Sequence, residues 1–302
     1  MTKLLSICIP TYNRSRFLAW TLRKTLADFP DAEILVSDND STDDSWGLSW
    51  APSSLARAQW IRQPTNIGAF NNMREVLLAS DTKYCCYLGD DDYLLPAEVQ
   101  KGIDFLEANP NVVAYYAPCQ LWDEVEQKSV FEAFYQPDGP QTFSHDPRGR
   151  VALWNFVHAH HVWPEHAIYR RSELDAILAK RSATAYWCFT DLANATTVGE
   201  VHFHDKPYYR NITQHPVGQR YKLGDAQCLT DFEVYRTGLE LMAFDLFQGF
   251  PIPPESHRGI NDMIRQFIWV RMEVAGRLYR AQGNMQMAEE MHKRCAVTAL
   301  QV

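Results

Sequence analysis

Short apolar runs alternate with amphipathic stretches through the first part of the chain, and this alternation predicts an α/β fold. Residues 4–9 form an apolar run that ends at Pro10, which is typical of a buried strand, and apolar side chains then recur at helical spacing between Phe17 and Leu26. The same reasoning predicts strands at 33–37, 58–63 and 83–88 and a helix at 71–79. Such alternation favours a mostly parallel sheet, whose ligands bind beyond the carboxyl ends of the strands.

The second part of the chain continues this pattern less regularly and then changes. We expect helices at 98–108, 151–162, 172–180 and 192–197, strands at 112–117, 165–169 and 200–203, and variable loops over the polar stretch 118–150. After residue 224 the chain consists of long amphipathic segments at 231–247, 256–282 and 284–300, which predict helices. The expected organisation is a sheet domain at 1–224, with halves at 1–117 and 118–224, followed by a helical region at 225–302.

The helical region carries both an apolar row and several arginines. Helical spacing relates Ile264, Phe267, Ile268, Arg271, Met272 and Ala275, which predicts that this face packs against the catalytic domain. The alternative is contact with a membrane surface or a lipid-linked molecule through the arginines at 265, 271, 277 and 280.

Charge and cysteine usage narrow the functional class. The net charge of −8 argues against nucleic acid as a partner, because binding to a phosphate backbone needs an excess of Lys and Arg. The seven cysteines include no CxxC pair, which favours reduced thiols and a cytoplasmic protein. No apolar stretch approaches the roughly 18 residues of a membrane span. A peripheral contact with the inner face of the cell membrane stays open, as does a homodimer.

Two acidic loops follow predicted strands and supply the main candidate chemistry. In the first, Gly89 precedes three aspartates, whose mutual repulsion favours a bound cation such as Mn²⁺ or Mg²⁺ over a solvated turn. In the second, residues 37–44, Asp38 or Asn39 would accept a hydrogen bond from a nucleobase N–H. The alternative for this loop is an Asx turn with a helix N-cap.

Four motifs in the first hundred residues resemble the GT-A glycosyltransferases, in particular family 2. They are SICIPTYNR at 6–14, VSDNDSTDD at 36–44, NIGAFNN at 66–72 and YLGDDDYLLP at 87–96. The resemblance implies a GT-A, Rossmann-like α/β fold and an inverting transfer of a sugar from a nucleotide diphosphate sugar to an acceptor hydroxyl. It makes 1–117 the nucleotide-binding half and 118–224 the acceptor-binding half of the catalytic domain.

The resemblance also implies roles for individual residues. The nucleotide and donor would be bound by Pro10, Thr11, Tyr12, Asn13, Arg14, Asp38, Asn39, Asn66, Gly68, Asn71, Asp90, Asp92 and Arg210. The metal ligands would be Asp91, Asp90 and His215. Many members of the family have Asp where this chain has Asn39, which leaves the identity of the base open.

The catalytic base of the family corresponds to Asp191 in this chain. The family usually has an acidic pair at the start of a helix, upstream of a glycine, and here the stretch is Phe189-Thr190-Asp191-Leu192 with Gly199 following. Thr190 departs from the usual Glu. Asp191 would accept the proton of the attacking hydroxyl, and the alternative is a helix N-cap.

For the histidines and tryptophans outside the motifs, we consider both a structural role and a role in binding. His202 and His204 lie on one face of a predicted strand and are expected to be structural; the alternative is that they are metal ligands. The run of histidines at 158, 160, 161 and 166 lacks a cysteine at zinc-ligand spacing, so we expect an acceptor-binding wall there. Trp154 and Trp163 would either stack on sugars in that wall or belong to the core.

The sequence therefore predicts a metal-assisted inverting transferase that builds a polysaccharide or O-antigen, with a glycan or lipid-linked glycan as acceptor. A UDP-sugar is the favoured donor, with CDP, GDP and dTDP left open. One alternative is a sugar-1-phosphate nucleotidyltransferase, although the chain lacks the glycine-rich loop of that class. The other is a non-catalytic nucleotide-sugar-binding module, against which the intact aspartate cluster counts.

Overall fold

The computed structural model describes residues 4–50, 57–179, 182, 184–218, 232–249 and 254–299, which form two compact units. The described part of the first unit comprises residues 4–50, 57–145, 163–179 and 194–218. The second unit comprises 146–162, 182, 184–193, 232–249 and 254–299. The domain boundary expected at residue 224 lies outside the described residues.

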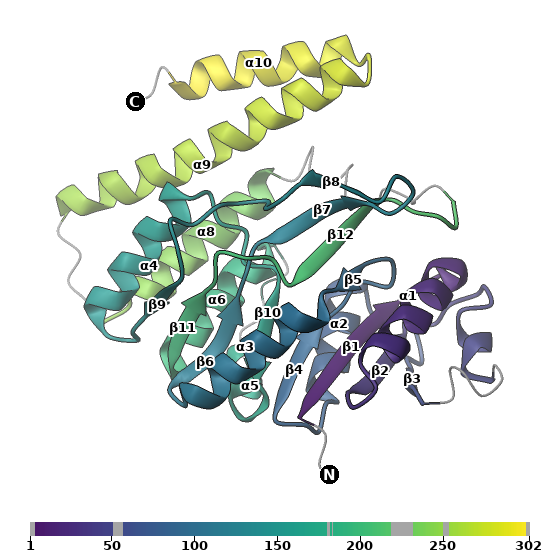
Figure 1. Cartoon of the computed structure of the whole chain (residues 1–302). Helices are drawn as coiled ribbons and strands as arrows, with labels where there is room; N and C mark the ends of the chain where they lie inside the picture. Colours follow the sequence, from purple (N-terminus) through teal and green to yellow (C-terminus); the bar gives the residue numbers. More distant parts are fainter. Residues whose placement is uncertain are drawn as a thin grey trace. The chain divides into compact units, whose positions relative to one another are not determined.

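The first unit is built on an eight-stranded, mostly parallel sheet, as the sequence predicts (Figure 1). Its strands, in spatial order, are β3 (Gln59–Arg62), β2 (Glu33–Asp38), β1 (Leu5–Thr11), β4 (Tyr84–Tyr87), β10 (Ala167–Arg170), β6 (Val112–Tyr116), β11 (Glu200–Phe203) and β9 (Gln141–Phe143). Strand β10 runs antiparallel to both of its neighbours and β9 runs antiparallel to β11. Strand β1 pairs in parallel with both β2 and β4, so the carboxyl ends of these three strands meet at one edge of the sheet.

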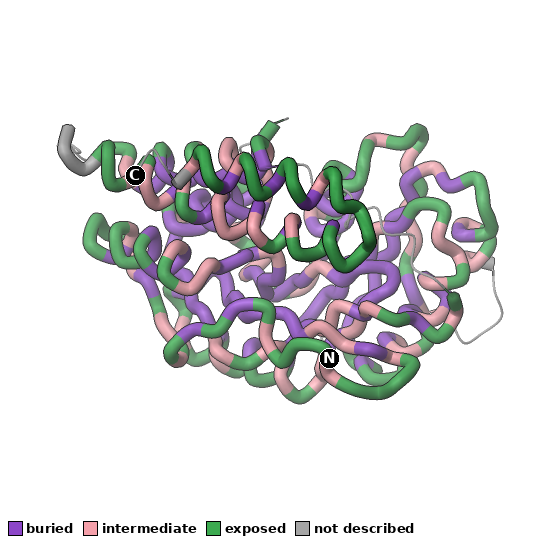
Figure 2. The backbone as a smooth tube through the Cα atoms, turned by 90° about the horizontal axis from the view of Figure 1, so that it is seen from above, coloured by how far each residue is buried: buried purple, intermediate pink, exposed green. Residues whose placement is uncertain are grey.

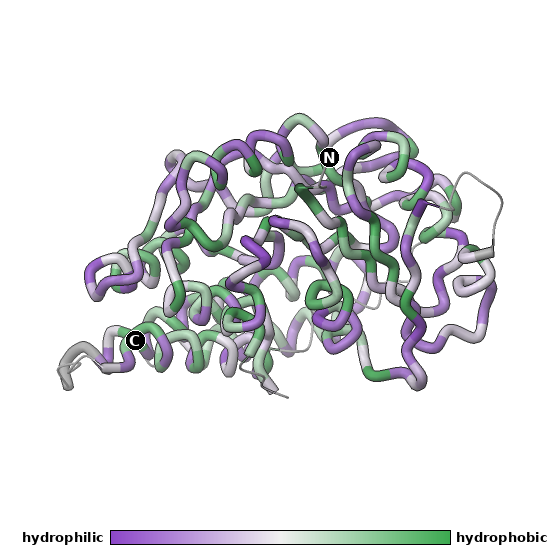
Figure 3. The backbone as a smooth tube through the Cα atoms, turned by 90° about the horizontal axis from the view of Figure 1, so that it is seen from below, coloured by the Kyte–Doolittle hydropathy of each residue, from purple (hydrophilic) through white to green (hydrophobic). Residues whose placement is uncertain are grey.

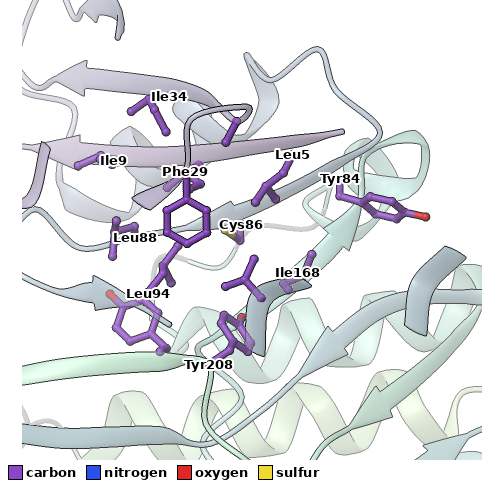
Figure 4. Packing of buried hydrophobic residues seen from close by; sticks show 14 of the residues in the cluster. Leu5, Ile9, Phe29, Ile34, Tyr84, Cys86, Leu88, Leu94, Ile168 and Tyr208 are labelled. Carbon is purple, nitrogen blue, oxygen red and sulfur yellow. The ribbon is translucent and has the colours of Figure 1, made fainter. Parts of the chain in front are cut away.

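The two faces of this sheet bury different side chains because strand residues alternate between faces. Leu5, Ile7 and Ile9 of β1 join the main hydrophobic cluster, which also contains side chains of the helices α1 (Ser15–Asp28) and α3 (Pro96–Ala108). Figure 4 shows part of this cluster, and Figure 3 shows the hydropathy of each residue along the backbone. The unit also contains the helices α2 (Ala69–Leu78) and α5 (Arg171–Ile177) and a short 3₁₀ helix at Trp46–Trp50.

A second, four-stranded sheet belongs to the same unit and was not expected. It consists of β5 (Tyr93–Leu94), β12 (Tyr209–Gln214), β7 (Cys119–Asp123) and β8 (Lys128–Phe131). The expectation of loops over 118–150 is therefore wrong, since β7, β8 and β9 all lie in that stretch. These strands are short. β7 and β8 form a local antiparallel hairpin, whereas β7 also pairs with β12 and β9 pairs with β11, which are far away in sequence.

The second unit is helical. It contains α4 (Pro147–Ala159), the first part of α6 (Trp187–Val198), α8 (Phe232–Phe247), α9 (Pro254–Ala281) and α10 (Met285–Ala299). The apolar row from Ile264 to Ala275 is buried, which confirms that it packs. Figure 2 distinguishes buried from exposed positions along the helices. Gly276 lets α10 approach closely, because a Cβ atom there would lie 3.3 Å from that of Met291.

The arginines of α9 form contacts within this unit. Arg271 donates a hydrogen bond to His161, at 2.7 Å, and Arg265 and Arg277 pair with acidic residues on the same helix. Among the described helices, none is both long and apolar enough to cross a bilayer.

Gly199, between α6 and β11, provides a test of close packing in the first unit. A Cβ atom at this position would lie 2.8 Å from the backbone oxygen of Asn111. We expect Gly199→Ala to lower the free energy of unfolding by about 1–3 kcal/mol, the usual cost of overpacking. The matched control is Gly47→Ala in the same unit, where a Cβ atom would meet nothing closer than 4.0 Å. Urea denaturation measures both, and equal stability of the two variants would contradict the prediction.

Candidate active site

Three buried aspartates follow strand β4, and Arg14 neutralises two of them. Its guanidinium contacts Asp90 at 3.0 Å through Nη1 and Asp91 at 2.5 Å through Nη2. Thr11, at the end of β1, donates a hydrogen bond of 2.7 Å to the second oxygen of Asp90. The loops after β1 and β4 are thus joined by ion pairs and a hydrogen bond.

Asp92 faces the second sheet instead. Its two carboxylate oxygens accept hydrogen bonds of 2.9 Å from the hydroxyl of Tyr209 and from the backbone N–H of Ile212, both on β12. The same hydroxyl accepts a hydrogen bond from the N–H of Gly89. Asp92 therefore fixes the acidic loop to β12, and no local sequence pattern identifies Tyr209 as its partner.

The three aspartates of the acidic loop carry more negative charge than Arg14 alone compensates. Burial raises the pKa of Asp90 to about 7, Arg14 opposes this rise, and the charge of Asp91 adds to it. No group of three or more His, Cys, Asp or Glu side chains within the described residues is arranged to hold a metal ion. The arrangement instead fits a Mn²⁺ or Mg²⁺ ion that takes one or two carboxylates and completes its shell with substrate phosphates and water.

The loop after β1 is held against the loop after β2 by Asn13. This residue has a left-handed backbone with a φ of 53°. Its side-chain oxygen accepts hydrogen bonds from the backbone N–H groups of Thr42 and Asp43, at 2.7 and 3.3 Å. Asn13 thus holds the two loops together through hydrogen bonds within the protein. Its neighbour Tyr12 is 42% exposed, and Pro10 is half-buried.

Asp38, at the end of β2, is fully buried and incompletely paired. One carboxylate oxygen accepts a hydrogen bond of 3.3 Å from the N–H of Ser41 and lies 3.8 Å from Arg62. The other oxygen has no hydrogen-bond partner. A buried acceptor without a donor costs about 1–3 kcal/mol, so this oxygen is an energetically unfavourable feature of the loop after β2.

Asn39, the other candidate for base binding, is engaged with the protein. Its amide donates to the side chain of Asn66 and its oxygen accepts from the N–H of Ile67, both at 2.9 Å. Gly68, with a φ of 84°, directly precedes α2, and its backbone N–H donates to the side-chain oxygen of Asn66. The side-chain amide of Asn71 donates to the backbone oxygen of Ile67.

Asn72, which sequence reasoning missed as a site residue, is buried beside this loop. Its oxygen accepts from the hydroxyl of Ser37 at 2.6 Å, and its amide donates to the backbone oxygen of Ser37 at 2.9 Å. Its place in the NIGAFNN motif was the available signal. The motif residues around Asn39 and Asn72 therefore form a hydrogen-bonded scaffold for the loops after β2 and β3.

Arg210 on β12 and His215 directly after it, the candidates for donor and metal binding, both contact other side chains of the protein. Arg210 donates a hydrogen bond of 2.6 Å to Gln120, and its guanidinium lies 3.9 Å from the ring centre of Trp122. His215 is buried with its ring edge-on to Phe17 and Trp20 of α1, at centroid distances of 4.8 and 4.5 Å. His215 does not form a three-ligand group with Asp90 and Asp91.

The run of histidines expected to form one wall is divided between the two units. His158 and His161 belong to the helical unit, where burial lowers their pKa values to about 4 and about 3. Trp154 is also buried there. In the sheet unit, Trp163 is buried and His202 accepts or donates a hydrogen bond with Thr142, which is a structural role.

His166 lies in the sheet unit behind the acidic loop. Its ring stacks on Tyr209 at a centroid distance of 3.7 Å and lies parallel to that of Tyr87 at 6.4 Å. Burial lowers its pKa to about 3, so the ring is neutral, and neither ring nitrogen has a hydrogen-bond partner. The ring thus supports Tyr209 and, through it, Asp92.

Asp191 belongs to the helical unit and is 1% exposed. Helix α6 begins at Trp187, so Asp191 lies in its second turn. The alternative reading of Asp191 as an N-cap is therefore wrong. The helix begins earlier than expected because the chain before it is already fixed, with the N–H of Tyr186 donating to the backbone oxygen of Val234.

The sequence model of glycosyl transferase family 2 matches residues 6–178, which include the three loops described above. The chain belongs to this family. An uncharacterized glycosyltransferase of Haemophilus influenzae is 28% identical over 160 residues, which cover 51% of this chain and 50% of that protein. The abequosyltransferase RfbV of Salmonella typhimurium is 33% identical over 96 residues, 30% of this chain and 29% of that protein. The chain thus spans about half or less of these relatives.

Solved structures support the GT-A fold of this glycosyltransferase family member. TarS of S. aureus, residues 1–349 in complex with UDP-GlcNAc, has a TM-score of 0.57 at 13% identity and covers 96% of this chain and 90% of that one. The mannosyltransferase PcManGT of Pyrobaculum calidifontis, in complex with GDP-Man and Mn²⁺, has a TM-score of 0.56 at 13% identity and covers 99% and 81%. At this identity the likeness shows the fold.

Two substitutions of His166 separate its packing from its hydrogen-bonding capacity. His166→Ala removes the ring and should lower the free energy of unfolding by about 2–5 kcal/mol through the cavity it leaves. His166→Phe keeps a stacked ring and removes two nitrogens that have no hydrogen-bond partner, so it should cost less than about 1 kcal/mol or stabilise the protein. Urea denaturation measures both. If the Phe variant is as unstable as the Ala variant, the nitrogens have partners and the interpretation fails.

Proposed function

We propose that this protein is an inverting, metal-assisted glycosyltransferase that uses a nucleoside diphosphate sugar. The single observation that carries the proposal is the convergence of Arg14, Asp38 and the Asp90–Asp91 pair at the ends of three adjacent strands. This edge of the sheet offers an acceptor for a base and charged groups for a diphosphate. Membership of glycosyl transferase family 2 assigns the reaction class.

The nucleoside would be bound by the loops after β1 and β2. The unpaired oxygen of Asp38 would accept a hydrogen bond from a base N–H, and the exposed ring of Tyr12 offers an aromatic face nearby in sequence. UDP is the favoured nucleotide because a uracil N–H is a suitable donor to a carboxylate, and TarS in the similar fold binds UDP-GlcNAc.

The diphosphate would be bound beside Arg14, Asp90 and Asp91. A Mn²⁺ or Mg²⁺ ion held by Asp91 and Asp90 would stabilise the negative charge that develops on the departing diphosphate. The Mn²⁺ in the PcManGT complex supports the use of such an ion in this fold. Asp92 would orient the acidic loop, since β12 occupies both of its oxygens.

Transfer would proceed by a single displacement at the anomeric carbon. The acceptor oxygen forms the new bond to that carbon while the bond to the phosphate oxygen breaks, and the electron pair leaves with the diphosphate. The proton of the acceptor hydroxyl would pass to Asp191, the residue that matches the base of the family. The geometry inverts the configuration of the sugar.

The acceptor is proposed to be a glycan or lipid-linked glycan of a bacterial surface polysaccharide such as O-antigen. The sequence similarity to an abequosyltransferase supports this class. The six described cysteines are buried free thiols, which agrees with synthesis on the cytoplasmic side of the membrane.

Nucleotide binding tests the donor site directly. We expect at least one of UDP, CDP, GDP and dTDP to raise the melting temperature in the presence of Mn²⁺, since it binds the native state only. Asp38→Ala should weaken binding of that nucleotide at least about tenfold through loss of a charge-assisted hydrogen bond. Asp44→Ala, an exposed aspartate of the same loop, is the control and should bind normally. Absence of any shift would refute the donor site.

Steady-state kinetics tests the base. Asp191→Asn should reduce kcat about 10²–10⁴-fold, the usual contribution of general base catalysis, with little change in nucleotide affinity. Glu240→Gln, an exposed acid of the same unit, makes the same change in charge and should leave kcat unaltered. Release of nucleoside diphosphate in the presence of acceptor is the measurement. Wild-type turnover by Asp191→Asn would show that another group accepts the proton.

A further inference from the structure

The position that a metal ion would need is already held by a cation of the protein. The Asp90 and Asp91 side chains are 6% and 3% exposed, and both contact the guanidinium of Arg14. The remaining oxygen of Asp90 accepts a hydrogen bond from Thr11. A divalent ion on the Arg14-bound oxygen of Asp91 would therefore compete with Arg14 for the same charge.

Two cations at this place would repel each other strongly, because the carboxylates are shielded from water and the local dielectric constant is low. Removing Arg14 without replacement is equally costly, since it leaves buried carboxylates without a counter-ion. The two constraints together favour an exchange, in which one cation leaves as the other arrives.

From this geometry we infer that Arg14 is an internal counter-ion that releases Asp91 when a divalent metal binds, and that its guanidinium then pairs with the diphosphate of the donor. The inference rests on the proposed function and adds a mechanism for it. Metal and diphosphate would consequently bind as a pair, each favouring the other.

The surroundings of Arg14 allow its side chain to move while its backbone stays in place. Its N–H donates to the hydroxyl of Ser45 at 3.1 Å, and its backbone oxygen accepts from the N–H of Leu18 at 3.0 Å, the first turn of α1. The side chain is 26% exposed, and the guanidinium lies 5.1 Å from the ring centre of Phe17. The planar guanidinium forms paired hydrogen bonds with phosphate as readily as with carboxylate.

The exchange has a thermodynamic consequence. Mn²⁺ alone must displace Arg14 from a buried pair, and a nucleoside diphosphate alone meets an Arg14 whose charge is already satisfied. When both bind, the released guanidinium has the diphosphate as its new partner. By linkage, each ligand must raise the affinity of the other by the same factor.

Binding of Mn²⁺ alone, followed by electron paramagnetic resonance of the unbound ion, tests the inference without substrate or turnover. Arg14→Gln should bind Mn²⁺ at least about tenfold more tightly than the wild type, within the usual range of coupling between sites. Arg14→Lys keeps the charge and should bind Mn²⁺ weakly, as the wild type does. Arg16→Gln, an exposed arginine two residues away, is the control and should match the wild type.

The same titration is repeated with saturating UDP and with saturating GDP. In the wild type, a nucleoside diphosphate that binds should tighten Mn²⁺ binding about 5–150-fold. Arg14→Gln should show a smaller coupling, because only the direct ligation of the metal by the phosphates remains. Unchanged or weaker Mn²⁺ affinity in Arg14→Gln would overturn the inference, as would equal Mn²⁺ affinity of the wild type with and without a bound nucleotide. The second comparison needs no variant, so it holds if Arg14→Gln does not fold.

The outcomes separate this inference from the proposed function. If nucleotides bind but Arg14→Gln and the wild type bind Mn²⁺ with equal affinity, the donor site stands and the exchange is wrong. If no nucleotide binds while Arg14→Gln still tightens Mn²⁺ binding, the counter-ion role stands and the transferase proposal is wrong.

Discussion

The guanidinium of Arg14 lies between two buried carboxylates that would otherwise repel each other at the end of β4. Through Asp90 and Asp91 it connects the loop after β1 to the acidic loop. Because these carboxylates are almost inaccessible to water, burying them without a cationic partner would be costly. The geometry of the proposed donor site depends on this contact, and so does the way in which a metal ion would enter it.

Around this pair, backbone groups and amide side chains determine the shape of the site. Asn13 joins the loops after β1 and β2, and Asn39 joins the loop after β2 to the start of α2. Asp92 and Tyr209 fix the acidic loop to the second sheet. Three loops that are separate in sequence are thereby held in one arrangement, in which one oxygen of Asp38 has no hydrogen-bond partner.

The features that depend on local sequence were predictable. The strands β1, β2 and β4 are apolar runs, and the acidic loops follow them directly, so their meeting at one edge follows from a parallel sheet. Contacts between distant segments were not predictable. Arg14 is 77 positions from Asp91, and Tyr209 is 117 positions from Asp92. For the same reason the second sheet was missed, whereas the start of α6 was misplaced because tertiary contacts extend the helix beyond its local pattern.

The most direct test of a donor site at this edge is a crystal structure with Mn²⁺ and the nucleoside diphosphate that binds best, with the ion located by its anomalous scattering. Our account predicts an anomalous peak between the Asp91 carboxylate and the diphosphate, the base next to Asp38, and the Arg14 guanidinium on a phosphate oxygen. A nucleotide bound at another part of the protein, or a metal peak away from Asp90 and Asp91, would contradict it.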